Sequence, residues 1–330
     1  MHIAARCAVF VTLLLMGVAR GAAPAPRLTP AGDYHQHVFS AQAIALAGPD
    51  AGLTPLDARD VVALLDTAGI RKGLLLSTAY MFGSPRFQLD SRLDDEYVRV
   101  RAENDWTAAQ AARYPGRLIA FCGFNPLKDY ALAELKRCAG LPGLQRGIKL
   151  HFGNADVQLD DPNHVEKLRQ VFAAANAARM AIVVHLRANI RHQRPYGVAQ
   201  ARIFLDQLMP AAPDVVVQVA HLGGSGPGFD DPPARAVLAA LAQACEKREP
   251  GTRKLWFDVA SVVDRDIAPA DAAEVAQRIR QIGAERVLYG TDAAQGGNLR
   301  PRDAWAAFLR LPLSEREFAR IARNVPPYFR

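Results

Sequence analysis

The sequence predicts an α/β protein whose single domain folds as a (β/α)₈ TIM barrel. Three observations favour that fold: eight short apolar segments, a helical pattern between them, and a spacing of roughly 25 to 45 residues from one segment to the next. Alternation of strands and helices implies a parallel sheet. Eight such repeats fit a chain of 330 residues. An open doubly wound sheet is the alternative that the same pattern allows.

The first 21 residues predict a secretory signal peptide, which leaves the barrel to residues 22–330. Arg6 precedes an uncharged, mainly apolar run from Cys7 to Ala19, and small residues follow at Gly21 and Ala22. The run is shorter than the about 20 residues of a membrane span. We therefore expect cleavage after Gly21 or Ala22, a periplasmic or secreted protein, and no stable membrane anchor. An uncleaved anchor is the alternative.

Charge and cysteine content limit the partners. Loss of Arg6 and Arg20 takes the formal net charge from +7 to +5, which indicates solubility or mild attraction to anionic surfaces. Since no basic stripe is interleaved with aromatic residues, we expect no nucleic-acid partner. Cys122, Cys138 and Cys245 remain, an odd set without the spacing of a disulfide framework or a cysteine zinc site. One pair could still bridge in an oxidising compartment. The sequence leaves open which pair that is, and whether the chain forms a homo-oligomer.

The expected strands are unbroken apolar runs, such as Leu74-Leu75-Leu76, which are typical of strands covered on both faces. In chain order they span 32–38, 72–78, 118–125, 145–152, 181–186, 215–222, 255–261 and 286–292.

Helices are expected between the strands, and two of them carry capping boxes. Thr54 with Asp57 predicts the start of the first helix, and Gly69 its end. Ser314 with Glu317 predicts the start of the last helix. Residues 39–53 and 79–93 are expected to be loops. The helices between the first and the final two span 94–113, 128–139, 162–179, 197–209, 232–248 and 271–282.

The first strand carries the segment Asp-Tyr-His-Gln-His, and the later strands end in residues of related chemistry. His35 and His37 are two positions apart, so a strand projects them to the same side. In a barrel the active site lies at the carboxyl ends of the strands. Imidazoles with one carboxylate are suitable ligands for zinc, manganese, iron or nickel. A bound ion would lower the pKa of a water and supply a hydroxide nucleophile. The residues at these strand ends are His35, His37, Lys149, His185, His221 and Asp292.

Five of these residues, all except Lys149, also have a purely structural interpretation. The histidines could be hydrogen-bonded residues of the barrel core, and Asp292 could cap the helix after the last strand. Their joint occurrence at the correct strand ends favours a functional site over five separate coincidences.

The motifs together resemble the amidohydrolase superfamily over nearly the whole mature chain. The matching pieces are the His-x-His, Gly-Ile-Lys-Leu-His, Val-Val-His-Leu, Ala-His-Leu-Gly-Gly, Tyr-Gly-Thr-Asp and the terminal Ile-Ala-Arg-Asn. The motifs Ala-His-Leu-Gly-Gly and Tyr-Gly-Thr-Asp are most similar to those of the amidohydrolase-related branch. That branch includes aminocarboxymuconate-semialdehyde decarboxylase and the sugar and pyrone-dicarboxylate lactonases.

The resemblance implies a role for each site residue. It implies that one divalent metal ion, with zinc as the first expectation, is held by His35, His37, His185 and Asp292. His221 would contact the metal-bound water or polarise the substrate carbonyl. Asp292 would also accept the proton of the water and pass it to the leaving group, as a base within hydrogen-bond reach can do.

Lys149 leaves the metal count open. In dinuclear members of the superfamily a carboxylated lysine on the fourth strand bridges two metals, so a carboxylated Lys149 would imply two ions. An uncarboxylated Lys149 would instead be a cation suited to a carboxylate or carbonyl oxygen of the substrate.

Substrate-binding candidates are Lys149, Arg187 and His151. Arg187, Arg191 and Arg194 lie in the loop after the fifth strand, and guanidinium groups bind carboxylates in pairs of hydrogen bonds. A solvated basic loop is the alternative for the latter two. The segment after the second strand adds Tyr80, Phe82 and Arg86 as pocket walls. The glycines of 223–228 are expected to turn the chain away from the metal and leave room for substrate.

The sequence therefore predicts a metal-dependent hydrolase that attacks a lactone, ester or amide of a small acidic molecule. A nonoxidative decarboxylase with the same metal site is one alternative, since both activities share the ligands. A noncatalytic metal- or ligand-binding barrel is an alternative of another class.

Overall fold

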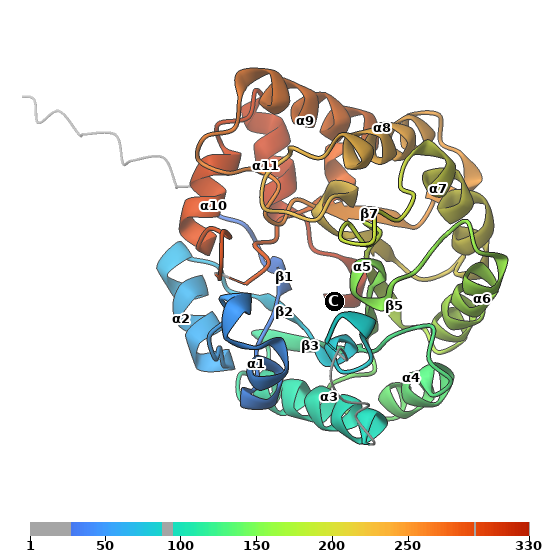
Figure 1. Ribbon diagram of the computed structural model, residues 1–330. Helices are drawn as coiled ribbons and strands as arrows, with labels where there is room; N and C mark the ends of the chain where they lie inside the picture. The colour runs from blue at the N-terminus through green and yellow to red at the C-terminus, as the bar shows by residue number, and fades with distance from the viewer. Residues whose placement is uncertain (1–27, 88–94, 294, 330) are drawn as a thin grey trace, which may run out of the picture.

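A computed structural model describes residues 28–87, 95–293 and 295–329, and it has the predicted (β/α)₈ barrel (Figure 1). One parallel sheet contains the eight strands, and each strand pairs with its successor in the sequence. This order excludes the doubly wound alternative, in which the strand order reverses within the sheet. The strands are β1 Asp33–Gln36, β2 Gly73–Leu76, β3 Leu118–Gly123, β4 Gly147–His151, β5 Ala181–His185, β6 Val217–Val219, β7 Leu255–Asp258 and β8 Val287–Leu288.

Helices surround the ring of strands in Figure 1, as the alternating pattern predicts. They are α1 Ala41–Ala47, α2 Ala58–Ala68, α3 Glu96–Ala112, α4 Ala131–Ala139, α5 Phe152–Ala155, α6 Pro162–Ala177, α7 Val198–Ile203, α8 Pro232–Glu246, α9 Pro269–Ile282, α10 Pro301–Phe308 and α11 Glu315–Arg323.

The ring of strands closes through contacts between β1 and the segment after β8. The Asp292 amide donates to the His35 carbonyl at 2.7 Å. The buried Asp33 carboxylate accepts a hydrogen bond of 2.6 Å from the Thr291 hydroxyl. These contacts hold β1 against the segment that follows β8 and so close the ring.

Successive residues of one strand pack into two different cores. On β2, Leu75 faces the helices, whereas Leu74 and Leu76 lie in a smaller cluster with Phe121 and Phe329. Phe329 comes from the C-terminal end of the chain, which Figure 1 places in the centre of the ring. The barrel interior is therefore filled by side chains at this level, as in other barrels of eight strands.

Several predicted boundaries are wrong, and local chemistry explains two of them. Helix α2 begins three residues later than expected, because Asp57 rather than Thr54 is its N-cap and forms the capping box with Asp60. Strand β6 ends at Val219, three residues early, because the next segment turns. Two other boundary predictions are confirmed. The capping box of Ser314 and Glu317 begins the last helix, and α2 ends at Gly69, where φ is 72°.

The other boundary errors concern short elements. The expected loop 39–53 contains α1, and the segment after β4 contains α5. The helix expected to run to residue 209 is α7 followed by a π-helical turn, Phe204–Leu208. Short elements carry too little periodicity to be distinguished from loops by pattern.

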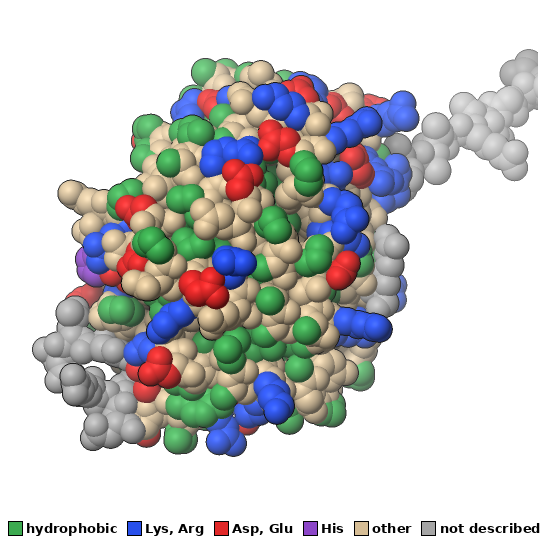
Figure 2. Space-filling model, turned by 90° about the vertical axis from the view of Figure 1, so that its right-hand side faces the viewer, with side chains coloured by type: hydrophobic (Ala, Val, Ile, Leu, Met, Phe, Trp, Pro, Cys, Tyr) green, Lys and Arg blue, Asp and Glu red, His purple; other side chains and the backbone are tan. Residues whose placement is uncertain are grey.

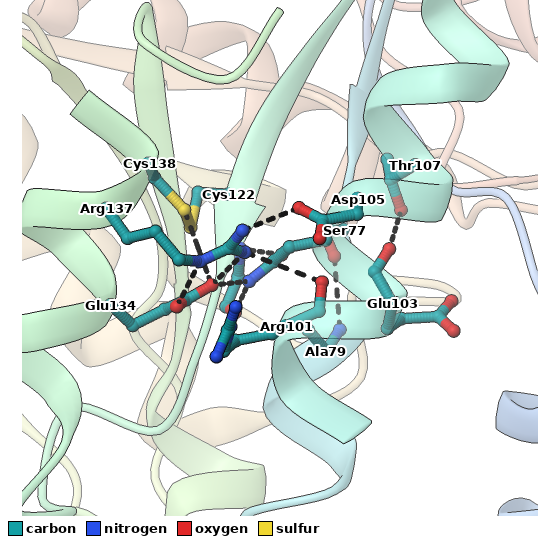
Figure 3. Close-up of a disulfide and its surroundings, with 12 residues drawn as sticks. Ser77, Ala79, Arg101, Glu103, Asp105, Thr107, Cys122, Glu134, Arg137 and Cys138 are labelled. Carbon is teal, nitrogen blue, oxygen red and sulfur yellow. Dashed lines mark hydrogen bonds and ion pairs between the residues drawn. A yellow bond between two sulfur atoms is a disulfide. The ribbon is translucent and has the colours of Figure 1, made fainter. Parts of the chain in front are cut away.

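A disulfide joins Cys122 at the end of β3 to Cys138 on α4 (Figure 3). Both cysteines are fully buried. The equally buried Glu134 lies beside them, and its carboxylate accepts a hydrogen bond of 2.7 Å from Arg137. The structure thus assigns the pairing that the sequence left open.

The outer surface is ordinary for helices that face solvent. On the flank seen in Figure 2, basic and acidic side chains lie among scattered apolar ones, and basic side chains gather along the right-hand edge. Among the described residues, no helix is both long enough and apolar enough to cross a bilayer. The predicted signal peptide, residues 1–21, lies outside the described residues.

Candidate active site

The strand-end residues selected from the sequence line one cavity of about 410 Å³ at the carboxyl end of the barrel. Neighbouring parallel strands end at the same edge, so residues distant in sequence meet there. The cavity wall includes His35, His37, Lys149, His151, His185, His221 and Asp292.

His35 and His37 project from β1 toward Asp292. The Nδ1 atom of His37 lies 2.7 Å from the Leu76 carbonyl, which can only accept, so this nitrogen carries the hydrogen. The Nδ1 atom of His35 lies 3.0 Å from a carboxylate oxygen of Asp258. In both rings the other nitrogen, Nε2, lies near Asp292 Oδ1, at 3.4 Å from His35 and 3.3 Å from His37.

His221 adds a third imidazole in the same tautomer. Its Nδ1 donates to the Ala260 carbonyl at 2.8 Å, so Nε2 is the nitrogen that remains for a ligand. The ring centroids of His221 and His35 are 4.6 Å apart. The chain at His221 and Leu222 has positive φ angles of 53° and 50°, and this turn is what ends β6 early. The sequence expected an extended strand here.

Backbone conformations of this kind recur around the cavity. Ser261, Asp292 and Ala293 also have positive φ, between 52° and 62°. Non-glycine residues adopt this region at a cost of order 1 kcal/mol or more, and such residues cluster at functional sites. The turns after β6, β7 and β8 therefore all hold this conformation next to the candidate ligands.

Asp258 is a site residue that the sequence reasoning missed. It ends β7 and is fully buried beneath the histidines. Burial alone would raise the pKa of Asp258, but His35 and the hydrogen bonds that it accepts hold this pKa well below its usual value. A signal was present, because Asp258 is the only acidic residue of the expected strand 255–261.

The charges at the centre favour metal-binding protonation states. Burial and the adjacent Lys149 lower the pKa of His35 to about 3, so its ring is neutral near pH 7. Burial would raise the pKa of Asp292, but the hydrogen bond to His37 and the neighbouring imidazoles hold it well below the usual value. A neutral imidazole and an ionised carboxylate are the forms that bind metals.

Lys149 lies against His35 on the β4 side. Its Nζ is 3.2 Å from His35 Nε2, and the side chain is 1% exposed. Burial lowers the pKa of Lys149 to about 8. Within the described part of the chain its amine has no ion-pair partner within 4 Å, which leaves it available to an anionic group.

His151 and His185 form the next part of the wall. Their rings stack at 3.8 Å between centroids with an interplanar angle of 18°, and Tyr80 lies 5.0 Å from His151. The Nδ1 atom of His151 accepts a hydrogen bond from the Asn154 amide, so a neutral His151 carries its hydrogen on Nε2. Burial lowers the pKa of both histidines well below the usual value.

Two tight groups of candidate ligand atoms occur at the mouth, each with all of its atoms within 4.8 Å of one another. One is His35, His37 and Asp292, and the other is His35, His221 and Asp258. His185 lines the same cavity but lies outside both groups; its ring centroid is 5.1 Å from that of His221. Imidazole nitrogens with carboxylate oxygens are a donor set that fits a divalent transition metal.

The arginines of the rim have separate roles. Arg187 is occupied by Asp231, with hydrogen bonds of 2.6 and 3.3 Å, and Arg194 by Asp156. Arg86 and Arg191 line an outer lobe of about 450 Å³ next to His151, and neither has an ion-pair partner among the described residues. Burial and the charge of Arg191 lower the pKa of Arg86.

Of the three residues predicted to form pocket walls, two line the cavity and one does not. Tyr80 and Arg86 do line the central cavity, whereas Phe82 is fully buried in the outer core and does not. Asn324, from the terminal Ile-Ala-Arg-Asn, lies far from the ligands; its amide donates to the Ala284 and Val287 carbonyls and anchors β8.

Comparisons with known proteins agree with this architecture. A family model described as Amidohydrolase matches residues 33–324. Among curated proteins, none matches the sequence.

Three of the solved structures that share this fold are an acid hydrolase, a decarboxylase and a zinc-bound amidohydrolase. A probable 2-pyrone-4,6-dicarboxylic acid hydrolase of Acinetobacter baumannii, with citric acid bound, is 18% identical with a TM-score of 0.53, over 89% of this chain and 96% of that one. A 5-carboxyvanillate decarboxylase of Novosphingobium aromaticivorans, a mutant with bound manganese, is 14% identical with a TM-score of 0.61, over 91% and 97%. An amidohydrolase of Burkholderia multivorans with bound zinc is 15% identical with a TM-score of 0.55, over 89% and 96%. At these identities the likeness shows a shared fold.

Proposed function

The chain belongs to the amidohydrolase family, and from that membership we propose that it is a metal-dependent hydrolase of a small acidic lactone, ester or amide. The observation that carries the proposal is the convergence of several imidazoles on one carboxylate. The Nε2 atoms of His35 and His37 lie within 3.4 Å of Asp292, and His221 and His185 line the same cavity.

We assign one divalent ion to His35, His37, His185 and Asp292, with zinc as the first candidate. His185 lies outside the tight groups, so it must approach the other three residues for all four to coordinate one ion. When bound, such an ion polarises a carbonyl and makes water a stronger acid.

The protein's own groups supply the proton transfers and the orientation. Asp292 is ionised and lies beside the cavity, so it can take the proton of an attacking water and later give it to the leaving oxygen or nitrogen. His151 offers an Nε2 hydrogen to a substrate oxygen, and Lys149 offers a cationic donor next to His35. His221 can polarise the carbonyl that is attacked.

An acidic substrate is supported by the outer lobe. Arg86 and Arg191 face this lobe without an acidic partner among the residues described, whereas Arg187 and Arg194 are neutralised by aspartates. Guanidinium groups bind carboxylates through charge-assisted hydrogen bonds. We therefore assign the carboxylate of the substrate to Arg86 and Arg191, and we give Arg187 the task of shaping the lobe.

A nonoxidative decarboxylase is the second candidate. The same fold occurs in a 5-carboxyvanillate decarboxylase with bound manganese, and a carboxylate near Lys149 would be placed to leave as carbon dioxide. Product analysis separates the two: a decarboxylase releases carbon dioxide without consuming water, and a hydrolase incorporates oxygen from labelled water.

We also propose that the protein is exported. The signal-like residues 1–21 support export, and so does the disulfide of Cys122 with Cys138, since such bonds persist in oxidising compartments. Processing is checked by the mass of the mature protein recovered from an exporting host.

The decisive experiment measures metal per chain in protein exported from a host and purified without chelators. We expect one equivalent in the wild type, loss in His185→Ala, and retention in His164→Ala, whose histidine lies on α6 away from the cavity. Two equivalents would indicate a carboxylated Lys149 and would make phosphoesters and amides the substrates to test first. No metal under metal-replete conditions would contradict the proposal and leave a binding protein or a metal-free lactonase.

A further inference from the structure

We propose that the C-terminal turn Pro327–Phe329 is part of the support of the metal site, with Tyr328 as a positioning residue for the ligand His35. This inference rests on the proposed function, because it assigns Tyr328, Gln218 and Asp258 to the orientation of that ligand. None of these three residues faces the cavity that holds the candidate ligands.

The turn enters the barrel from the amino ends of the strands, opposite the cavity. Arg146, just before β4, donates to the Tyr328 carbonyl at 2.8 Å, and the Lys72 amine, just before β2, lies 5.4 Å from the Phe329 ring centroid. The Tyr328 ring packs edge-on against Phe121 at 5.0 Å. Figure 1 shows the same arrangement, with the C-terminus in the middle of the ring of strands.

From this turn a line of side-chain hydrogen bonds runs up the barrel interior. The Tyr328 hydroxyl donates to Gln218 Oε1 at 2.5 Å. Gln218 Nε2 donates to Asp258 Oδ2 at 2.7 Å, and the same oxygen accepts from His35 Nδ1 at 3.0 Å. Gln218, Asp258 and His35 are each fully buried.

The direction of the line is fixed by a group that cannot be reversed. Gln218 Nε2 also lies 3.2 Å from the Tyr34 backbone carbonyl, which is only an acceptor. The amide nitrogen of Gln218 must therefore face Asp258, and the amide oxygen must face Tyr328. A hydroxyl at position 328 matches that oxygen, whereas a phenylalanine would leave it buried without a donor.

Asp258 is the residue through which this line of hydrogen bonds orients the His35 ring. Its Oδ2 accepts from Gln218 and His35, and its Oδ1 accepts from the backbone amides of His221 and Ala260 at 2.9 and 3.1 Å. Four donors leave the carboxylate no rotational freedom. Partners that orient a ligating histidine in this way typically change metal affinity or activity by about 10- to 100-fold when they are removed.

The barrel also offers a matched control. The Tyr34 ring lies in the same interior cluster and packs edge-on against Phe329, with ring centroids 5.6 Å apart. The Tyr34 hydroxyl is the group to compare with that of Tyr328. Among the described residues this hydroxyl is buried without a hydrogen-bond partner. Tyr34→Phe and Tyr328→Phe therefore remove the same atom from the same layer, and only the second removes it from the line to His35.

The test measures zinc affinity of the wild type, Tyr328→Phe, Gln218→Leu, Asp258→Asn and Tyr34→Phe by competition with a chromophoric chelator, together with cobalt(II) absorption spectra and thermal melting of each protein. We expect zinc binding to weaken about 3- to 10-fold in Tyr328→Phe, about 10-fold in Gln218→Leu and up to about 100-fold in Asp258→Asn. The cobalt bands should shift in these three variants. Tyr34→Phe should keep wild-type affinity and spectrum.

The outcomes separate the inference from the proposed function. A wild type that binds zinc, with unchanged affinity and spectrum in Tyr328→Phe and Gln218→Leu, would overturn the inference and leave the metal site standing. A wild type that binds no metal would overturn both. The inference would also be overturned if Tyr328→Phe and Tyr34→Phe lost zinc affinity and melting temperature to the same extent. Tyr328 would then have only a structural role. If Tyr328→Phe fails to fold, the shift of the cobalt bands in Gln218→Leu decides.

Discussion

The two ends of the barrel are built from the same eight strands but have opposite chemistry. At the carboxyl ends, His35, Lys149 and Asp292 line an open cavity. At the amino ends, Leu74, Phe121 and Phe329 fill the interior. The difference arises along single strands, because a shift of a few residues moves a side chain from the filled level to the open one. Stability and reactivity can therefore be changed separately, and each of the following changes tests that separation.

The largest effect is expected at the mouth, in Asp292→Asn. The carboxylate is both a metal ligand and the proton acceptor, so we expect activity to fall by at least about 10³-fold and metal content to fall with it. Because Asp292 lies in a turn at the cavity, the far-UV circular dichroism spectrum should stay that of the wild type. Unchanged turnover would remove Asp292 from the mechanism. Intact ligand binding with no turnover in the wild type itself would favour the noncatalytic barrel.

The next effect is expected at the filled end, in Leu74→Ala. Leu74 is fully buried on β2, and truncation of such a leucine lowers the free energy of unfolding by about 3 kcal/mol. Metal affinity should not change, since Leu74 is absent from the cavity wall. Urea denaturation measures the first quantity and chelator competition the second. Leu132→Ala, on the exposed face of α4, is the control and should cost far less. An equal loss of metal affinity in Leu74→Ala would mean that the two ends are not separable.

A smaller effect is expected in the outer lobe, in Arg191→Ala. Loss of one charge-assisted contact should raise KM for an acidic substrate about 10-fold and leave kcat within about twofold. Arg194→Ala is the matched control, because Arg194 belongs to the same loop but is bound to Asp156. Steady-state kinetics on an acidic substrate and its neutral ester should show the KM effect only for the acid. Equal effects of the two substitutions would assign substrate recognition elsewhere.

The smallest effect is expected on the outer wall, in Glu317→Gln. The Arg280 guanidinium and the Ser314 amide lower the pKa of Glu317 to about 2. A carboxylate with a lowered pKa stabilises the fold above its unfolded value of 4.5 and loses that contribution as pH falls toward 2. The substitution should therefore cost about 1 kcal/mol at pH 7 and progressively less below pH 4.5. Melting temperatures across that range measure it, with Glu315→Gln on the same helix as the control. A difference that grows toward low pH would contradict the assignment.

Much of the fold could be predicted from the sequence, because the patterns that indicate strands and helices are local. Unbroken apolar runs such as Leu74-Leu75-Leu76 located the strands, and the spacing of His35 and His37 placed both on one side of β1. The capping box of Ser314 with Glu317 was equally local and is confirmed. Turn chemistry was harder: Asp57 displaced Thr54 as the cap of α2, since both residues favour that position.

By itself the sequence determined the barrel and the set of residues at its mouth, because periodicity and strand ends are properties of neighbours in the chain. The tertiary structure alone decided which distant groups meet. It paired Cys122 with Cys138, gave Arg187 to Asp231, and set Asp258 beneath His35. It also linked Tyr328 to that aspartate through hydrogen bonds with Gln218. Hydrogen bonds and ion pairs act over a few ångströms in space, and only closure of the barrel brings residues so far apart in sequence to that distance.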